Sequence, residues 1–537
     1  MNDKAIKEII LSKPRNRSRL MELKRRISRK YGVETQKNSD ILRVYHKLVR
    51  TGQVRKDFEL EELLRKRSIR TLSGIAPVAV LTKNYPCPGK CVYCPTEKSV
   101  PKSYLSNEPA VMRAIRNNYD PYKQTQLRLR ALENNGHLPT KIELIVIGGT
   151  WSVLPKKYKY WYIKECFRAA NDYPYNRDQS FEGQKKYSHK NLRTLKEDLK
   201  RQQKRNEGSV YRIIGLTLET RPDYINDKEL FEMRELGATR VELGVQAVDD
   251  DILAKNKRGH NLDTIIGATQ ALRDYGFKIT YHIMPGLPGS DHKKDLSMFR
   301  LLFEHPGLKP DQIKFYPTVV TKGSVLYRWW KQGKYKPYSD KELQKLIIEC
   351  KKLIPYYTRV IRLIRDIPGE SIEAGNKITN LRQIMKDKKT PCFCIRCRES
   401  REKEFKFKDL KLFIIKYQTE EGQERFISYE SPDRSSLYGF VRLRLPQINK
   451  NKLLEDLPKT AFIRELHVYG ELVSVGKDDS KKTQHRGLGK KLMSEAEKQA
   501  LLAGFDHLAV ISGVGVRGYY RKFGYKLKNT YMVKNLK

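Results

Sequence analysis

Short apolar runs rich in β-branched residues recur between residues 75 and 385. Amphipathic stretches with apolar positions three or four residues apart, such as 226–237 and 264–276, separate the later runs and predict helices. The apolar runs predict strands at 77–82, 142–149, 213–220, 240–246, 278–284 and 312–320. Alternating strands and helices favour a parallel sheet with right-handed crossovers, and six such units suit an α/β fold, a partial (β/α)6 TIM-like barrel. Polar residues gather at the carboxyl ends of these strands, where such barrels place their chemistry.

The pattern changes near residue 405. Strands are predicted at 407–417, 424–430, 437–445, 463–475 and 507–514, with one long helix at 490–505. Successive strands with few helices between them favour an antiparallel sheet. We therefore expect a separate α+β domain at 405–537.

The amino-terminal segment has its own character. Leu20, Leu23 and Ile27 stand at helical spacing within 18–32, and Gly32 is a stop signal. Residues 1–70 hold 21 Lys or Arg against 9 Asp or Glu. We expect four parts, namely a basic helical region at 1–72, the barrel at 73–385, a cysteine-rich linker at 386–404 and the α+β domain. The polar segment 175–209 is expected to be a surface excursion.

The charge of the chain points to a polyanionic partner. Its 537 residues include 108 Lys or Arg and 62 Asp or Glu, a formal net charge of +46. Nucleic acid fits better than a membrane, because no apolar run approaches the roughly 18 residues that span a bilayer. Lys and Arg of 1–72 and of 185–205 are the candidate phosphate contacts, and the alternative is that these charges only solvate helix faces. No secretory signal precedes the first helix, so we expect a cytoplasmic protein with reduced cysteines.

Three of the eight cysteines, Cys87, Cys91 and Cys94, form a C-x3-C-x2-C loop after the first predicted strand. Three thiolates can hold three irons of a 4Fe-4S cluster and leave the fourth iron open to a small molecule. The alternative is a zinc site completed by a distant ligand. The spacing resembles the radical S-adenosylmethionine superfamily, in which the open iron binds the methionine part of the cofactor and an added electron cleaves it to a 5′-deoxyadenosyl radical.

Further candidates for binding S-adenosylmethionine lie at the ends of the following strands. A glycine pair lets the backbone approach a ligand amine, and acidic, basic and amide side chains suit ribose hydroxyls and a carboxylate. Alternatively, the glycines form only a turn and the polar residues form ordinary ion pairs at the barrel mouth. The candidates are Gly148, Gly149, Glu219, Arg221 and Gln246.

A second cysteine group, Cys392, Cys394 and Cys397, lies in the predicted linker. These thiolates can wrap one tetrahedral ion, and zinc that fixes the domain geometry is the favoured occupant. A second iron-sulfur cluster is the alternative. No histidine stands nearby, so the fourth ligand is either distant or a water molecule.

The run QHRGLGKKLM at 484–493 opens the long helix of the last domain. Free backbone N–H groups at such a glycine-rich helix start suit a pyrophosphate. Together with YYRKFGY at 519–525, the run resembles the GNAT acetyltransferase fold, in which the strand around Leu466 and Val468 would bind the pantetheine arm of acetyl-CoA. Tyr520 is the candidate acid for the departing thiolate, and Tyr519 is the alternative. His467 faces the side of its strand opposite Leu466 and Val468, and the alternative is that it is only a surface residue.

A radical S-adenosylmethionine barrel joined to a GNAT domain resembles the family of Elongator catalytic subunits, which modify the wobble uridine of tRNA. The resemblance is carried by 108–122, 215–225, 243–248, 256–260, 464–470, 485–493, 510–515 and 519–525. The compact cysteine spacing resembles the archaeal or bacterial form, which acts without clearly required partner subunits. This form would need an electron donor for the cluster, and a homodimer is left open.

The resemblance implies a reaction. The deoxyadenosyl radical would take a hydrogen from the methyl group of acetyl-CoA, the carbon radical would add to carbon 5 of uridine 34 in the anticodon loop, and hydrolysis would leave a carboxymethyl group. Acetyl-CoA is then a substrate. The family's acetyl-CoA contacts, with Lys141 and the tyrosines as catalytic candidates, fall on Lys141, Glu465, Leu466, His467, Val468, Gln484, Gly487, Leu488, Gly489, Lys490 and Tyr520. The rival function is a protein lysine acetyltransferase with a structural iron-sulfur cluster.

Overall fold

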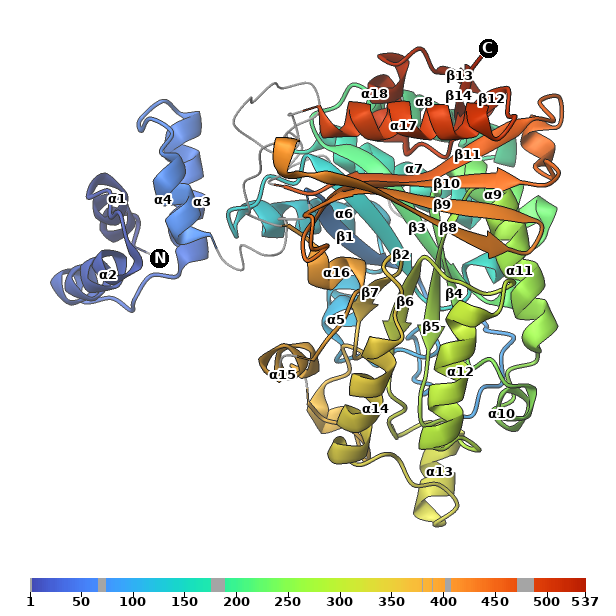
Figure 1. Cartoon of the computed structure of the whole chain (residues 1–537). Coiled ribbons are helices and arrows are strands. Elements are labelled where there is room, and N and C mark those ends of the chain that lie inside the picture. Colours follow the sequence, from blue (N-terminus) through green and yellow to red (C-terminus); the bar gives the residue numbers. More distant parts are fainter. Residues whose placement is uncertain are drawn as a thin grey trace.

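The computed structural model describes residues 2–65, 74–174, 189–378, 380–388, 390–400, 407–470 and 487–537. The expected domain boundaries at 72/73 and 404/405 lie outside these residues, and so does Gln484. Three bodies follow one another along the chain (Figure 1), and the barrel's hydrophobic core also includes residues of the third body such as Phe462, Ala509 and Tyr531.

The first body is a bundle of four helices, which lies apart from the rest of the molecule in Figure 1. The helices are α1 (Asp3–Leu11), α2 (Arg17–Tyr31), α3 (Asn38–Arg50) and α4 (Phe58–Leu64). The helix predicted at 18–32 is confirmed as α2, which buries Leu20, Leu23 and Ile27. It ends at Gly32, whose φ of +61° is the left-handed geometry of a helix C-cap.

The second body contains a parallel sheet whose strands follow the order of the sequence. The strands are β1 (Ala76–Leu81), β2 (Lys141–Ile147), β3 (Arg212–Thr220), β4 (Arg240–Gln246), β5 (Lys278–Ile283), β6 (Gln312–Phe315) and β7 (Arg359–Arg362). All six predicted strands are present, and the partial barrel is confirmed. The sheet adds β7, whose four residues RVIR are too short and too basic to stand out as an apolar run. Because β1 and β7 are edge strands that do not pair with each other, the barrel is open on that side.

Helices surround this sheet, most of them on its outer face (Figure 1). They are α5 (Pro109–Arg116), α6 (Pro121–Glu133), α7 (Lys156–Asp172), α8 (Leu192–Asn206), α9 (Asp227–Leu236), α10 (Asp250–Lys255), α11 (Leu262–Asp274), α12 (His292–Glu304), α13 (Val325–Lys331) and α14 (Asp340–Lys352). Of these, α10 and α13 lie at the lower end of the barrel in Figure 1. The short helices α15 (Leu381–Asp387) and α16 (Ile395–Arg398) lead toward the last domain. The helices predicted at 226–237 and 264–276 are confirmed as α9 and α11.

Helix α8 corrects the prediction that 175–209 is only a surface excursion. Its Leu195 and Leu199 are buried in the barrel's hydrophobic core, and α8 packs against α7. The buried face of α8 could not be recognised in the sequence, because most residues of the segment are polar and only a few leucines stand at helical spacing. Several basic side chains of the segment also pair with acids, as Lys190 and Arg201 do with Asp198. The remainder, 175–188, lies outside the described residues.

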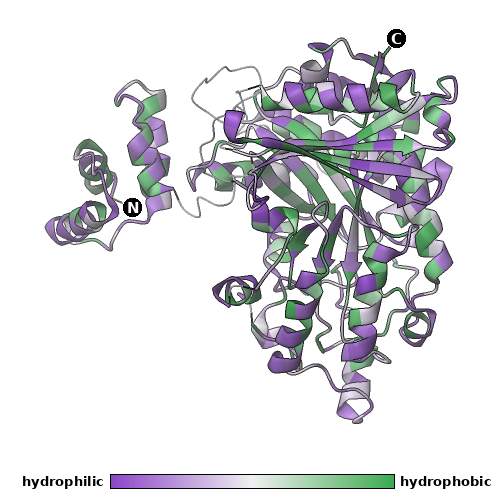
Figure 2. Ribbon diagram, in the orientation of Figure 1, coloured by the Kyte–Doolittle hydropathy of each residue, from purple (hydrophilic) through white to green (hydrophobic). Residues whose placement is uncertain are grey.

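The third body is the predicted α+β domain. Its strands are β8 (Lys411–Thr419), β9 (Gly422–Glu430), β10 (Leu437–Pro446), β11 (Thr460–Val468), β12 (His507–Val510), β13 (Lys526–Lys528) and β14 (Tyr531–Asn535). Helix α17 (Leu488–Leu502) packs on β9, β10 and β11 and shows alternating polar and apolar residues in Figure 2, and α18 (Arg517–Arg521) follows β12. Neighbouring strands are antiparallel except β11 and β12, which pair in parallel only from Thr460 to Ile463. Beyond Ile463, β11 continues to Val468 without β12, so the two strands splay as a GNAT fold requires.

Buried ion pairs join the barrel to this domain. Asp311, just before β6, accepts hydrogen bonds of 2.6 and 2.7 Å from Arg464 of β11, which also donates to Glu424 of β9 at 2.9 Å. Lys278 at the start of β5 pairs with Glu465 of β11 at 2.7 Å. The amino ends of the barrel strands therefore meet β11, and the loops after their carboxyl ends lie at the far end of the barrel.

Candidate functional site

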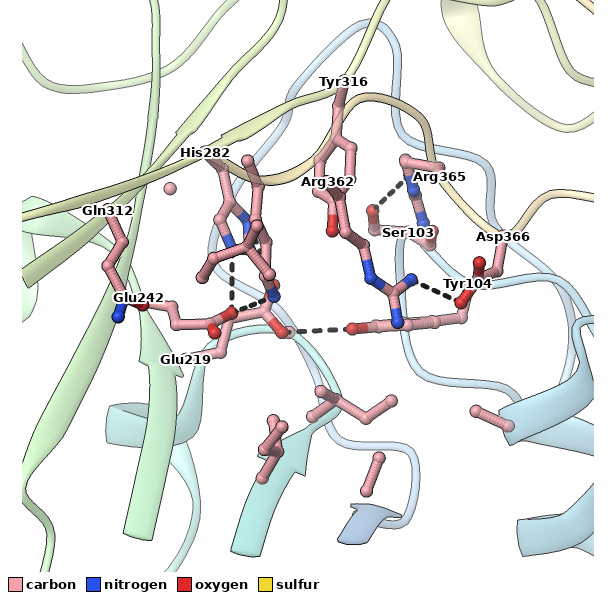
Figure 3. Close-up of a pocket in the computed structure, with 18 of the residues that line it drawn as sticks. Ser103, Tyr104, Glu219, Glu242, His282, Gln312, Tyr316, Arg362, Arg365 and Asp366 are labelled. Atoms are coloured by element: carbon pink, nitrogen blue, oxygen red, sulfur yellow. Dashed lines mark hydrogen bonds and ion pairs between the residues drawn. The ribbon is translucent and has the colours of Figure 1, made fainter. Parts of the chain in front are cut away.

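A cavity of about 830 Å³ runs along the inner face of the open barrel. At one end it is lined by Cys87, Cys91 and Cys94, and at the other by Glu465, His467 and Tyr469 of the last domain. Figure 3 shows polar side chains from several barrel strands pointing into it. The cavity thus connects the first cysteine group with the strand expected to bind acetyl-CoA.

The first cysteine loop leaves room for a cluster. Gly89 lies between two of the thiols, because a Cβ built on it would stand 3.5 Å from Cys91 Sγ and 3.6 Å from Cys87 Sγ. The same Cβ would stand 2.6 Å from Nη1 of Arg221, so a larger residue there would displace this guanidinium from the cysteine loop. A hydrogen bond from Cys94 and the nearby Arg258 and Arg221 lower the pKa of the Cys91 thiol despite its burial. A thiolate next to two cations is the form that binds iron.

The residues predicted to bind S-adenosylmethionine come together around this loop. Gly149, Glu219, Arg221 and Gln246 line the cavity, and Gly148 stands next to Gly149 at the end of β2. Gly148 and Gly149 have φ values of +139° and +92°, which side-chain-bearing residues rarely adopt. Gln246 has a φ of +73°, and its Oε1 is buried without a hydrogen-bond partner among the described residues. Such strain and an unsatisfied polar atom are typical of a ligand site.

Two of these residues have protein partners. Glu219 accepts a hydrogen bond of 3.1 Å from the Tyr104 hydroxyl (Figure 3). Arg221 donates to both carboxylate oxygens of Asp223, at 2.9 Å each. The alternative role predicted for these residues is an ordinary ion pair at the barrel mouth, and Arg221 forms such a pair. This pair holds the Arg221 guanidinium beside the cysteine loop.

A polar cluster inside the barrel has no counterpart among the sequence predictions. Glu242 of β4 pairs with Lys314 of β6 and lies 2.9 Å from Nε2 of His282 on β5 (Figure 3). Burial alone would raise the pKa of Glu242, but Lys314 and His282 hold it well below its usual value. The only signal in the sequence is a charged or imidazole side chain within each of these short strands, and it shows neither that the strands are neighbours nor that these residues face inward.

The second cysteine group forms a compact site. Cys392, Cys394 and Cys397 hold their sulfur atoms within 4.8 Å of one another. A tetrahedral zinc ion with Zn–S bonds of about 2.3 Å needs sulfurs roughly 3.8 Å apart, which this spacing approaches. Among the described residues, no other group of three such ligands lies so close. The looser first group suits separate irons instead.

Alternate residues of β11 serve different sides of the sheet. Leu466 and Val468 pack against the core of the last domain, whereas Glu465 and His467 line the barrel cavity. The alternative that His467 is a surface residue is therefore wrong, because the barrel covers that face of the strand. Burial lowers the pKa of His467 to about 4, so its imidazole is neutral at physiological pH.

The start of α17 lies beside β11. Gly487 caps the helix with a φ of +79°, Leu488 and Gly489 are buried, and Lys490 is exposed. A Cβ on Gly489 would stand 2.5 Å from the Tyr519 hydroxyl and 3.8 Å from Val468 Cγ2. Tyr519 is half-buried there, and Tyr520 packs in the domain core with 7% of its surface exposed.

Lys141 begins β2 and shares the inward face of that strand with Glu143, Ile145 and Ile147, which line the cavity. It pairs in register with Arg212, and Gly515 of the last domain packs against Arg212. Burial lowers the pKa of Lys141 to about 8. Lys141 therefore lies on the barrel floor near the splayed strands, and its contact with acetyl-CoA stays a prediction.

Arginines line the open side of the barrel. They come from α5 and α6 beside β1, and from β7, its following loop, α15 and α16 on the other side: Arg113, Arg128, Arg362, Arg365, Arg382 and Arg396. Such a positively charged opening suits a nucleic-acid backbone. Among the described residues, none of the helices combines the length and apolar character needed to cross a bilayer.

Comparison with known proteins gives consistent matches. The Radical SAM superfamily model matches residues 85–302, and the Radical_SAM C-terminal domain model matches 310–389. This match implies a 4Fe-4S cluster and S-adenosylmethionine, for which the first cysteine loop and the glycine pair are suited.

Relatives cover most of the chain. A tRNA uridine(34) acetyltransferase of Dehalococcoides mccartyi is 43% identical over 479 residues, which cover 88% of this chain and 100% of the relative. Elongator complex protein 3 of Homo sapiens is 38% identical over 501 residues, 88% of this chain and 86% of that protein. A solved structure of Methanocaldococcus infernus Elp3 that lacks residues 1–46 superposes with a TM-score of 0.71 at 37% identity, covering 86% of this chain and 99% of that one. The chain therefore belongs to the family of tRNA uridine(34) acetyltransferases and Elongator complex protein 3, within the Radical SAM superfamily.

Proposed function

We propose that this enzyme installs a carboxymethyl group on carbon 5 of the wobble uridine, position 34, of tRNA, with acetyl-CoA as the carbon source. The observation that supports this most is the continuous cavity between the first cysteine loop and β11. An enzyme that only transferred acetyl groups to a peptide would have no need to join these two places. We expect it to act in the cytoplasm, where its tRNA substrate is found.

The cluster bound by Cys87, Cys91 and Cys94, together with S-adenosylmethionine, would supply the radical that activates the acetyl methyl group. The chain's own residues would position the reactants. The glycine pair after β2, with Glu219, Arg221 and Gln246, would hold S-adenosylmethionine at one end of the cavity. Leu466, Val468 and the start of α17 would hold acetyl-CoA at the other end, with Lys141 on the floor between them. Tyr520 would protonate the thiolate of CoA when the thioester is hydrolysed.

Two basic surfaces would hold the tRNA. The bundle α1–α4 lies in residues 2–65, which carry 18 Lys or Arg against 9 Asp or Glu. The arginines on the open side of the barrel would contact phosphates next to a base that enters the cavity. Zinc bound by Cys392, Cys394 and Cys397 would fix the connection between the barrel and the last domain.

The test is incubation of reduced, reconstituted enzyme with S-adenosylmethionine, acetyl-CoA and tRNA, followed by mass analysis of the nucleosides. We expect carboxymethyluridine only when all three substrates are present. Cys91→Ala and Cys94→Ala should abolish it and leave tRNA affinity within about twofold, since phosphate contacts lie elsewhere. Cys166→Ala, which changes a buried cysteine outside both groups, is the matched control and should stay active. Acetylated peptide without modified tRNA would instead support the lysine acetyltransferase.

A further inference from the structure

The loop Asn256–His260 lies directly against the first cysteine loop, and the proposed function gives it no role. The backbone N–H of Val92 donates to the carbonyl of Asn256 at 3.3 Å. The Asn256 amide donates to the carbonyls of Ile252 and Pro288, at 2.8 and 2.9 Å. These bonds fix the loop between α10 and the segment after β5, and they place its remaining side chains beside the cysteines.

Arg258 of this loop contacts a cluster ligand. Its Nη1 donates to Sγ of Cys91 at 3.0 Å, and its Nη2 donates to the carbonyl of Gly244. Arg221 in turn donates to the carbonyl of Arg258 at 2.5 Å. Arg258 is only 5% exposed, so its hydrogen bond to sulfur is shielded from water. Shielding strengthens the effect of a charged donor on an anionic acceptor.

The charge of Arg258 is not balanced by a carboxylate. Among the described residues, no Asp or Glu forms an ion pair with it, whereas the neighbouring Arg221 is paired with Asp223. The Cys91 thiolate is the anionic group to which its guanidinium donates a hydrogen bond. Arg221 reaches the same sulfur only at 4.0 Å.

We propose that Arg258 is a positioning residue that raises the reduction potential of the cluster, through the hydrogen bond from its buried guanidinium to the Cys91 thiolate. Hydrogen bonds to ligand sulfurs and burial are among the protein's means of setting such potentials. The step is the addition of one electron from a chemical reductant, with no bond made or broken. The reduced cluster carries one more negative charge, so a fixed cation on a ligand stabilises it more than the oxidised cluster. The inference rests on the proposed function only for the presence of the cluster.

The experiment is a redox titration of the full chain after anaerobic reconstitution, without tRNA, acetyl-CoA or S-adenosylmethionine. The midpoint potential is followed by electron paramagnetic resonance, with iron and sulfide content as the check on loading. For Arg258→Gln we expect about a tenfold less favourable reduction equilibrium, which is about 59 mV lower for a one-electron couple. Arg258→Lys should show a smaller fall. The matched control is Lys257→Gln, which removes one charge from an exposed position in the same loop and should keep the wild-type potential.

An unchanged potential in a fully loaded Arg258→Gln protein would overturn the proposal. If that variant holds too little iron, Arg258→Lys decides, since a wild-type potential there would also overturn it and a lowered one would support it. Loss of iron from both variants, with Lys257→Gln loaded normally, would show that Arg258 is needed to form the cluster rather than to set its potential. Because no substrate is present, these outcomes are independent of whether carboxymethyluridine is made.

Discussion

Successive residues of β11 face two different parts of the molecule. Leu466 and Val468 face the core of the last domain, and Glu465 and His467 face the barrel cavity, because successive side chains of a strand point to opposite sides. In the proposed function, this strand would bind the pantetheine arm of acetyl-CoA on one side and close the barrel cavity on the other.

Tyr520 and Tyr519 offer a test of the proposed acid. Burial raises the pKa of both hydroxyl groups, that of Tyr519 to about 12, so each is protonated and able to donate at neutral pH. We expect Tyr520→Phe to slow the release of CoA from acetyl-CoA by about 100-fold, the lower end of general acid catalysis, with tRNA affinity nearly unchanged. Tyr519→Phe is the matched variant and should slow it less. The reverse order in a thiol-release assay would assign the acid to Tyr519, whose hydroxyl is the one beside Gly489.

Lys141 predicts a pH dependence. Its pKa is lowered to about 8 by burial, so the free enzyme loses the ammonium charge as the pH rises through that value. The charged form is the one that attracts an acceptor oxygen, and we expect acetyl-CoA affinity to fall above pH 8 by up to about tenfold per pH unit. Calorimetry between pH 7 and 9.5 measures this. Lys141→Arg, which stays charged, should give a flat profile, and an equally steep fall in that variant would exclude the lysine as the cause.

At the scale of elements, the loops after β1 and β2 shape the cofactor end of the cavity. Gly148 and Gly149 both have positive φ, but only at Gly148 would a Cβ overlap with Thr82 Oγ1. The nearest atom to a Cβ on Gly149 is the carbonyl oxygen of Lys102 at 3.6 Å. Replacing each glycine in turn therefore distinguishes the cost of backbone strain from the cost of steric overlap.

We expect Gly148→Ala to lower the free energy of unfolding by at least about 2 kcal/mol and to weaken S-adenosylmethionine binding by at least tenfold. Gly149→Ala carries only the cost of its backbone conformation, about 1–2 kcal/mol. Urea denaturation and equilibrium dialysis of the reconstituted protein measure the two effects. Equal effects of both substitutions would contradict the role given to the overlap with Thr82.

Several elements could be predicted from the sequence because their signals are local. The apolar runs located six barrel strands, and the cysteine spacing located both cysteine groups, of which Cys392, Cys394 and Cys397 lie close enough together to hold one metal ion. Strand β7 could not be predicted, because four residues with two arginines carry no clear period. Helix α8 was misjudged because few of its residues are apolar. The cluster of Glu242, His282 and Lys314 and the cavity side of His467 depend on which elements become neighbours in space, and no local pattern reports that.

At the scale of the whole molecule, the buried ion pairs of Asp311 hold the barrel against the last domain. Burial opposes ionisation of Asp311, but Arg464 and Arg442 outweigh it and lower its pKa. Asp311→Asn removes one of the two carboxylates that neutralise Arg464 and leaves it only Glu424, so we expect the free energy of unfolding to fall by about 3 kcal/mol, the lower end of the cost of breaking a buried ion pair. Glu197→Gln, at the exposed pair with Arg193, is the control and should change it by less than about 0.5 kcal/mol.

The ion pairs of Asp311 also predict how the stability of the fold changes as the pH falls. A carboxylate whose folded pKa lies below its unfolded value of about 4 stabilises the fold above that pH and loses this contribution as the pH falls through the folded pKa. Wild-type stability should therefore fall below about pH 4, and Asp311→Asn should lose less on acidification. Denaturant titrations at pH 3 and pH 7 measure the difference, and parallel losses in both proteins would remove Asp311 from the explanation.

The most direct test of the central claim uses acetyl-CoA with three deuterium atoms on its methyl group. If the radical formed at the cysteine loop takes hydrogen from that methyl group, mass analysis should find one deuterium in 5′-deoxyadenosine and two in the carboxymethyl group of uridine 34. Unlabelled 5′-deoxyadenosine beside a labelled tRNA, or label found only on an acetylated amine, would contradict hydrogen transfer from acetyl-CoA to the radical formed at the cysteine loop.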